Sequence, residues 1–376
     1  MYGKQIRFFR GAYISPAEEE VLQTIENQIG IKFKLVVGDD FYYETHKGVS
    51  DQKEDMDFSV HNDSVTKIGV FNCELRVLPY SIGQLSSLKE LWLDDNQLTS
   101  LPESIGKLSL LELLGLGYNN IKSFPKSMNN LTSIRELHLS HNGLSILPES
   151  ITKLSLLRKL YLGANFMESL PESIGDLMAL QILQLTGCEL KSLPESIGNL
   201  TSLRVLDLSN NKLAALPESI GRLSSLEKLD LRSNQIKTLP ESFGQLTSLV
   251  KLILDSNQIW RLPKTIGNLS SLKILHVQNN QLSTLPKSIG DLSSLQELWL
   301  AANKINRLPD SMGKLLSLKD LALQSNKLTT LPEWIAQLSS LERLALFDNQ
   351  MRALPKKIGN LRFSKDFASG FYVRDN

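Results

Sequence analysis

The most regular feature of the sequence is a pattern of apolar positions that recurs every 23 residues. Each unit reads L-x-x-L-x-L-x-x-N-x-L-x-x-L-P-x-x-I-G-x-L-x-x, and the units run from 65–87 to 341–363. This span of 299 residues holds 13 units without insertion or deletion, and Leu, Ile, Val, Met or Phe fills all 91 apolar sites. A fixed period of this length predicts a solenoid in which every unit forms one coil.

The residue types within one unit predict its local structure. Leu229 and Leu231 alternate with a variable residue, which predicts a short strand with both leucines on one face. The Leu-Pro pair then turns the chain, because proline fixes φ and gives up an N–H that no ladder needs. The Ile-Gly-x-Leu segment predicts a short helical or 3-10 turn. Thirteen of the 14 prolines mark this place, from Pro79 to Pro355.

These residues resemble a leucine-rich repeat, and 226–236 is a typical match. The resemblance covers 299 of 376 residues, and the L-P-E-S-I-G-x-L spelling is similar to Ras-group proteins and to intracellular bacterial and archaeal members. It implies an α/β solenoid of 13 repeats, a right-handed horseshoe with a parallel concave β-sheet and a convex side of short helical or 3-10 turns. It also implies that asparagines such as Asn234 form a buried ladder that bonds backbone groups.

The two ends of the chain break the period and predict three segments: an N-terminal cap at 1–64, the repeats at 65–363 and a C-terminal cap at 364–376. Ser15 is expected to cap a helix that starts at Pro16, and 31–36 and 58–61 are expected to be strands with a loop over 39–57. The aromatic residues expected to cover the last leucines are Phe363, Phe367, Phe371 and Tyr372. An alternative for the N-terminal segment is a separate partner-binding element.

Charge and cysteine content limit the binding partners and the cellular compartment that are expected. Lys and Arg number 41 against 40 Asp and Glu, so bulk electrostatic attachment to nucleic acid or to an anionic membrane is not expected. Cys73 and Cys188 both occupy the asparagine position, where a buried, reduced thiol is expected. Free thiols are typical of a reducing compartment, residues 1–10 show no secretory signal, and the sequence has no apolar run of 18 residues. Together these features predict a cytoplasmic protein without a membrane span.

No motif in the sequence predicts catalysis. Phosphate-loop, H-E-x-x-H and C-x-x-C patterns are absent. His138 and His141 have no acidic or thiol partner at metal spacing, and the recurring Glu-Ser pairs are expected to be solvated surface. Because no nucleophile, base and orienting group can be assembled, the sequence predicts no enzyme, no cofactor and no metal.

The variable residues of the strands are expected to form the binding site, because the leucine scaffold determines the rest of the fold. Glycine in a strand often marks close approach by another group, and an aromatic notch is expected around Gly115, Gly117 and Gly163. Asp207, Asp230, Arg232 and Asp255 predict a mixed-charge centre, and Ile253, Ile274, His276 and Trp299 an apolar patch with Trp260 at its edge. The expected protein-binding residues on the concave face are Trp92, Asp94, His138, Tyr161, Asp207, Asp230, Arg232, Ile253, Asp255, His276 and Trp299.

The sequence thus predicts a non-catalytic protein–protein interaction scaffold that binds its partner on the concave face. The Ras-group resemblance implies a small GTPase or another signalling protein as partner. A regulatory or substrate-recognition module of an enzyme complex and a structural or adhesive protein are the alternatives. Nucleic acid is not expected, since acidic residues outnumber basic ones ten to six at the four central variable positions. A monomer is expected because the caps cover the exposed strand edges.

Overall fold

The computed structural model describes residues 6–37, 55–356, 358 and 371–372. Most of the expected loop at 39–57 lies outside these residues, as do Phe363 and Phe367. The chain separates into two compact units, which are described one at a time. The first unit comprises 1–167 and 176–182, and the second comprises 168–175 and 183–376.

The regular elements are short, apart from one N-terminal helix and two N-terminal strands. The strands are β1 (Arg7–Phe9), β2 (Ala12–Ile14), β3 (Lys34–Leu35), β4 (Asp55–His61), β5 (Ser64–Phe71), β6 (Glu90–Trp92), β7 (Leu113–Gly115), β8 (Glu136–His138), β9 (Lys159–Tyr161), β10 (Ile182–Gln184), β11 (Val205–Asp207), β12 (Lys228–Asp230), β13 (Lys251–Ile253), β14 (Ile274–His276), β15 (Glu297–Trp299), β16 (Asp320–Ala322), β17 (Arg343–Ala345) and β18 (Phe371–Tyr372). The α-helices are α1 (Pro16–Ile29) and α2 (Glu149–Thr152). The 3-10 helices are η1 (Tyr80–Gln84), η2 (Glu103–Lys107), η3 (Lys126–Asn130), η4 (Glu172–Asp176), η5 (Glu195–Asn199), η6 (Glu218–Arg222), η7 (Glu241–Gln245), η8 (Lys264–Asn268), η9 (Lys287–Asp291), η10 (Asp310–Lys314) and η11 (Glu333–Gln337).

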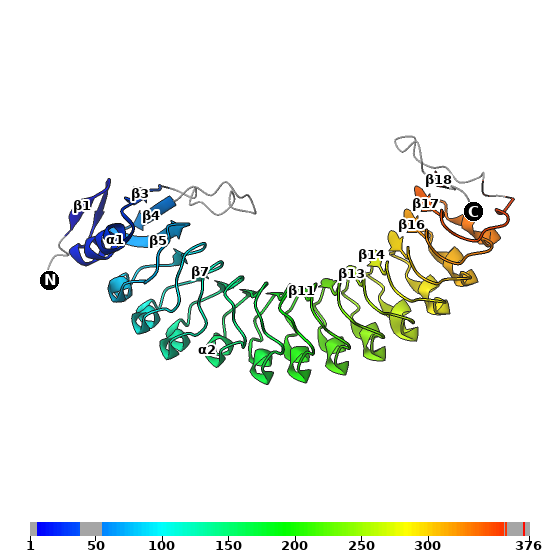
Figure 1. Ribbon diagram of the computed structural model, residues 1–376, viewed down its shortest axis with the longest axis horizontal. Coiled ribbons are helices and arrows are strands. Elements are labelled where there is room, and N and C mark those ends of the chain that lie inside the picture. Colours follow the sequence, from blue (N-terminus) through cyan, green and yellow to red (C-terminus); the bar gives the residue numbers. More distant parts are fainter. Residues whose placement is uncertain (1–5, 38–54, 357, 359–370, 373–376) are drawn as a thin grey trace. The chain divides into compact units, whose positions relative to one another are not determined.

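Parallel pairing at a 23-residue register builds the sheet of each unit. In the first unit β5 to β9 pair in chain order, as in Trp92 opposite Gly115. In the second unit β11 to β17 do the same, as in Asp207 opposite Asp230, and β18 pairs with β17. Figure 1 shows the strands along one side of the coils and the short helical turns along the other. The prediction of a leucine-rich-repeat solenoid is therefore confirmed.

The seven apolar positions of a coil form its core. In the coil 226–248 all seven side chains are between 0% and 6% exposed. They are Leu226, Leu229, Leu231, Ile236, Leu239, Phe243 and Leu246. One coil cannot enclose these side chains alone, so the buried area belongs to the stack of neighbouring coils.

Wherever a coil has the asparagine, that side chain bonds backbone groups of its own coil and of the preceding one. The amide oxygen of Asn257 accepts the N–H of Ile236 at 3.0 Å, and its nitrogen donates to the carbonyls of Leu231 at 2.9 Å and Leu254 at 3.0 Å. The same pattern recurs from Asn96 to Asn349. It satisfies groups that the turn would otherwise leave unpaired. The predicted ladder is therefore present.

Both cysteines stand in this asparagine column. Cys73 and Cys188 are buried free thiols, as expected. Their backbone N–H groups donate to the amide oxygens of Asn96 at 3.2 Å and Asn211 at 3.0 Å. The asparagine of the next coil therefore still accepts a backbone hydrogen bond from each cysteine.

The Glu-Ser-Ile-Gly segments join neighbouring coils on the helical side. Glu195 accepts the backbone N–H of Ser219 in the next coil at 3.3 Å, and Glu172 accepts that of Ser196 at 3.1 Å. A Cβ placed on Gly198 would lie 2.5 Å from the carbonyl oxygen of Ser219. The expectation that Glu-Ser is merely solvated surface is therefore wrong. The carboxylate is exposed, but it caps the following turn, and the glycine permits the close approach.

The N-terminal segment packs against the start of the first repeat. Ser15 and Glu18 form the capping box that begins α1, and Glu18 Oε1 also accepts the backbone N–H of Val65 at 3.0 Å. Strand β4 runs antiparallel to β5 and continues the expected strand at 58–61 back to Asp55. The β1–β2 hairpin was not predicted, because its strands are only three residues long.

Replacing Asn257 with Ala should destabilise the fold. The change removes four hydrogen bonds and leaves the buried backbone N–H of Ile236 without its partner. We expect a loss of about 3 kcal/mol in the free energy of unfolding, measured by urea titration. Gln258→Ala, at the adjacent position, is the control and should change the midpoint little.

Replacing Gly198 with Ala should force the adjacent coils apart, because the new methyl group would meet the Ser219 carbonyl. We expect a loss of about 1–3 kcal/mol. Thermal unfolding followed by circular dichroism measures it, with Asn199→Ala on the exposed neighbouring position as the control. Equal melting temperatures for the two variants would contradict the close-packing explanation.

Candidate functional site

The variable side chains of the sheet form one face in each unit. The first strand face consists of Trp92, Asp94, Gly115, Gly117, Glu136, His138, Lys159 and Tyr161. The second strand face consists of Asp207, Ser209, Asp230, Arg232, Ile253, Asp255, His276, Glu297 and Trp299. The buried leucines point away from both faces because successive residues of a strand alternate.

Three rings stack across the first strand face. The His138 ring lies edge-on to Trp92 at 5.2 Å between centroids and stacks on Tyr161 at 4.4 Å. These residues come from β6, β8 and β9, so the sequence correctly placed them on one face. Trp92, however, is only 2% exposed. A ring this buried offers little surface to a partner, and Tyr161 is the more accessible ring.

Beside Gly115 and Gly117, two of the three glycines of the predicted notch, the space is filled by this chain's own side chains. A Cβ on Gly115 would lie 2.4 Å from Trp92 Cε3 and 2.3 Å from Asp94 Oδ2. A Cβ on Gly117 would lie 2.8 Å from Asp94 Oδ1. The close approach that strand glycines indicate therefore exists, but the approaching groups are Trp92 and Asp94 and not a ligand.

Asp94 is held in an unusual environment by this packing. Its Oδ1 accepts the backbone N–H of Gly117 at 2.8 Å. Its Oδ2 is buried and has no hydrogen-bond partner in the described structure, although solvent reaches other parts of the residue. Burial raises the pKa of the carboxyl to about 6, against the opposing effects of the His138 charge and the Gly117 N–H.

Glu136 connects the stacked rings to a cation. It contacts His138 Nε2 at 2.8 Å and Lys159 Nζ at 2.9 Å. Burial opposes ionisation, but the hydrogen bonds from His138 and Lys159 prevail and lower the pKa of Glu136. Glu136 and Lys159 were missed from the sequence, although each stands two positions before a predicted residue, His138 or Tyr161.

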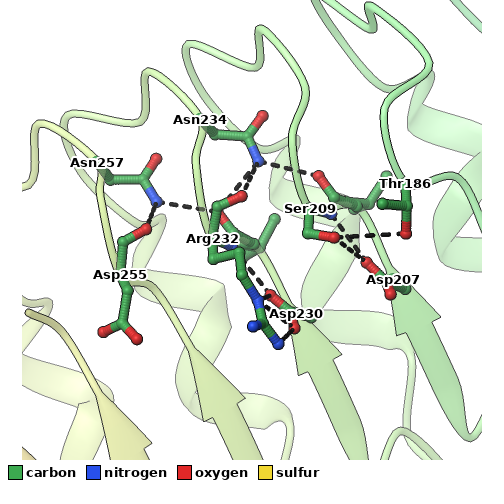
Figure 2. A network of polar contacts seen from close by, with 10 residues as sticks. Thr186, Asp207, Ser209, Asp230, Arg232, Asn234, Asp255 and Asn257 are labelled. Atoms are coloured by element: carbon green, nitrogen blue, oxygen red, sulfur yellow. Dashed lines mark hydrogen bonds and ion pairs between the residues drawn. The ribbon is translucent and has the colours of Figure 1, made fainter. Parts of the chain in front are cut away.

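The second strand face carries the predicted mixed-charge centre. The Arg232 guanidinium is paired with Asp230, and a hydrogen bond between Arg232 Nε and Asp230 Oδ2 measures 2.8 Å. Asp207 accepts hydrogen bonds from the hydroxyl of Ser209 at 2.7 Å and from its N–H at 2.9 Å. Figure 2 shows these groups below the ladder residues Asn234 and Asn257. The pKa of Arg232 is raised mainly by the hydrogen bond with Asp230, and the charges of Asp207 and Asp255 contribute in the same direction.

The apolar patch of the second strand face consists mainly of two stacked rings. His276 lies flat on Trp299, with centroids 3.8 Å apart and an interplanar angle of 3°. Burial lowers the pKa of His276, which favours the neutral ring. Ile253 is only 3% exposed, so it supports the patch from below. Trp299 remains partly accessible.

Trp260 does not extend this patch along the strands. It follows the Asn257 turn, outside β13, and it is 49% exposed. The Arg261 guanidinium lies 4.6 Å from the centre of its ring. The expectation that it forms the edge of the strand-face patch is thus corrected.

The two histidines with possible metal spacing face different neighbours. His141 stacks on Tyr118 at 4.0 Å, whereas His138 stacks on Tyr161. Within the residues that the structure describes, no three His, Cys, Asp or Glu side chains gather as a metal site. No helix among these residues has the length and apolar character needed to cross a bilayer. The arrangement of fixed rings and charges on short strands is typical of a binding surface.

Replacing Asp94 with Asn should change how stability depends on pH. The folded pKa of about 6 exceeds the ordinary value of 3.8, so the fold favours the protonated acid. The stability of the wild type should therefore fall as the pH rises from about 4 to about 6. The stability of the variant relative to wild type should increase over this range by about 2–3 kcal/mol, as measured by urea unfolding at several pH values. A difference that does not vary with pH would contradict the assignment.

Comparison with known proteins identifies the repeats. The leucine-rich repeat region family matches residues 69–169, 195–280 and 264–363, and a further leucine-rich repeat family matches 179–200. No curated protein matches the chain significantly.

Solved structures with the same architecture come from bacteria and plants. A leucine-rich repeat protein of Leptospira interrogans is 34% identical, with a TM-score of 0.67 over 79% of this chain and 83% of that chain. An internalin of Listeria monocytogenes is 28% identical, with a TM-score of 0.69 over 81% and 87%. The plant peptide hormone receptor RGFR1, solved in complex with RGF2, is 31% identical, with a TM-score of 0.59 over 81% and 53%. The chain belongs to the leucine-rich repeat proteins.

Proposed function

We propose that the strand faces bind a protein partner. Leucine-rich repeat proteins are typically non-catalytic binding scaffolds, and the plant receptor similar to this chain was solved with RGF2 bound. This function rests on the fold class and on the chemistry of the side chains that the fold presents.

The observation that carries the proposal is the ordering of accessible groups on the second strand face. The Arg232 side chain is 52% exposed, yet its pairing with Asp230 holds it in place. Trp299 is held flat against His276. Arginine and tryptophan are frequent anchors of interfaces. Because these groups are already fixed, binding would cost little side-chain entropy.

A small GTPase or another signalling protein is the partner class that we propose, with a role in signal transduction. The L-P-E-S-I-G-x-L spelling, similar to that of Ras-group members, supports this choice. A cytoplasmic location is supported by the buried free thiols of Cys73 and Cys188. A monomer is supported by the antiparallel pairing of β4 with β5, since β4 covers one edge of the first repeat strand.

Substituting both anchors should weaken partner capture. We expect the Arg232→Ala, Trp299→Ala double variant to retain at least about tenfold less partner from native lysate than the wild type, because interface anchors each contribute about 1–2 kcal/mol or more. Quantitative mass spectrometry measures the retained proteins. Lys304→Ala, an exposed change outside the strand face, is the matched control. Undiminished capture by the double variant, with its fold intact by circular dichroism, would contradict the proposal.

The same capture distinguishes the partner classes. A small GTPase should be enriched when the lysate contains a non-hydrolysable GTP analogue and depleted when it contains GDP. An enzyme retained equally under both conditions would favour a regulatory module of an enzyme complex. Recovery of the chain in the culture medium would favour an adhesive role and would contradict the cytoplasmic location.

A further inference from the structure

The repeats can be compared with one another, and three consecutive coils depart from the common spelling in the same direction. The position after Leu-Pro is Glu or Asp in eight of the 13 units, but it is Lys264 and Lys287 in two adjacent ones. Two positions before the proline, Arg occurs only as Arg261 and Arg307, where the other units have small or apolar residues. We name these four cations the basic flank. All four belong to the second unit.

The basic flank surrounds two adjoining hollows. A cavity of about 190 Å³ is lined by Arg261, Lys264 and Thr284, together with Glu241. A second cavity of about 540 Å³ is lined by Lys287, Arg307 and Thr284, together with Asp310. Thr284 and Leu285 line both cavities. The two hollows therefore adjoin at a wall formed by these two residues.

The cations of the basic flank have no anionic partner in the described part of the chain. Arg261, Lys264, Lys287 and Arg307 are exposed and take part in none of its ion pairs. Some other lysines on the coils are paired with the preceding or following coil, as Lys191 is with Glu168 at 2.7 Å and Lys153 with Asp176 at 3.1 Å. A group of like charges repels itself, and a bound anion would relieve that repulsion.

The Glu241 carboxylate within the first hollow already has a role. It accepts the backbone N–H groups of Lys264 at 3.4 Å and Thr265 at 3.3 Å, so it caps the next turn. Beside the hollow, Trp260 is 49% exposed and lies under the Arg261 guanidinium. The site thus combines free cations with an accessible aromatic ring.

We propose that the basic flank binds an acidic peptide segment of a protein partner, separately from the strand faces. Alternate side chains of an extended peptide lie on the same side, about 7 Å apart, so several carboxylates of one peptide can face the basic flank at once. The Trp260 ring offers a contact for an apolar residue next to the acidic run. The carboxylates of a peptide are spaced and can lie away from Asp310 and Glu241. A nucleic acid carries continuous negative charge along its phosphate backbone, which these two residues would repel. The chain as a whole has a net charge of only +1, which also disfavours nucleic acid.

Reversal of two charges tests this site in the full-length protein. The probe is a fluorescein-labelled decapeptide of alternating Glu and Ser, and fluorescence anisotropy measures its binding. We expect Lys264→Glu, Lys287→Glu to weaken binding more than about tenfold. Glutamate is the usual residue at this position of the repeat, so the variant should fold normally, which the melting temperature checks.

Three further variants locate the effect. Lys126→Glu makes the same change at the same repeat position outside the basic flank and should leave peptide affinity unchanged. Arg261→Thr, Arg307→Thr introduces the residue found at this position in neighbouring coils, at Thr238, Thr284 and Thr330, and should weaken binding comparably. Trp299→Ala on the second strand face should have no effect, which separates this site from the proposed partner site.

Several results would overturn the proposal. One is equal affinity of the wild type and the Lys264→Glu, Lys287→Glu variant for the peptide. Others are no measurable binding by the wild type, or a loss of peptide binding in Trp299→Ala. Tighter binding of a ten-nucleotide oligothymidylate, or of phosphatidylserine vesicles, than of the peptide would assign the basic flank to a different class of ligand and would equally refute it.

Discussion

The fold depends on how a tight coil satisfies its backbone polar groups. A turn of this kind leaves buried N–H and C=O groups without neighbours in the same coil, and an unpaired buried group costs about 1–3 kcal/mol. Asn257 resolves this by accepting from Ile236 in the preceding coil and donating to carbonyls in both coils. The asparagine column is therefore as necessary as the leucines. The leucines supply the driving force, and the amides make the turn compatible with burial.

Because ladder and leucines hold the coils in register, residues at the same repeat position line up with little freedom. This is why His276 can lie flat on Trp299, and why Asp94 can reach the backbone of Gly117 one coil later. The two strand faces nevertheless differ. The first is closed by Trp92 packing over Gly115, whereas the second presents Arg232 and Trp299. We propose the second as the principal contact surface for that reason.

Most of the fold could be predicted from the sequence, because the 23-residue period specifies strand, turn and core at once. Comparison of the same repeat position from unit to unit also placed Trp92, His138 and Tyr161 on one face. The solvent exposure of these side chains could not be predicted in the same way. Whether Trp92 points to solvent or lies over Gly115 depends on the empty space that a neighbouring glycine leaves, which is a property of two coils together. The contact between Glu195 and Ser219 was missed for the same reason, since each residue alone resembles ordinary surface.

The contact from glutamate to the next coil has a consequence for how such a chain can change. Glu195 reaches Ser219, and Glu172 reaches Ser196, each 24 residues later. A duplication or deletion of one whole coil would keep the asparagine ladder and the register at the new junction, whereas a partial one would break both. Unequal recombination within the gene would thus yield viable proteins in steps of one coil, and the unbroken period from 65 to 363 fits that history.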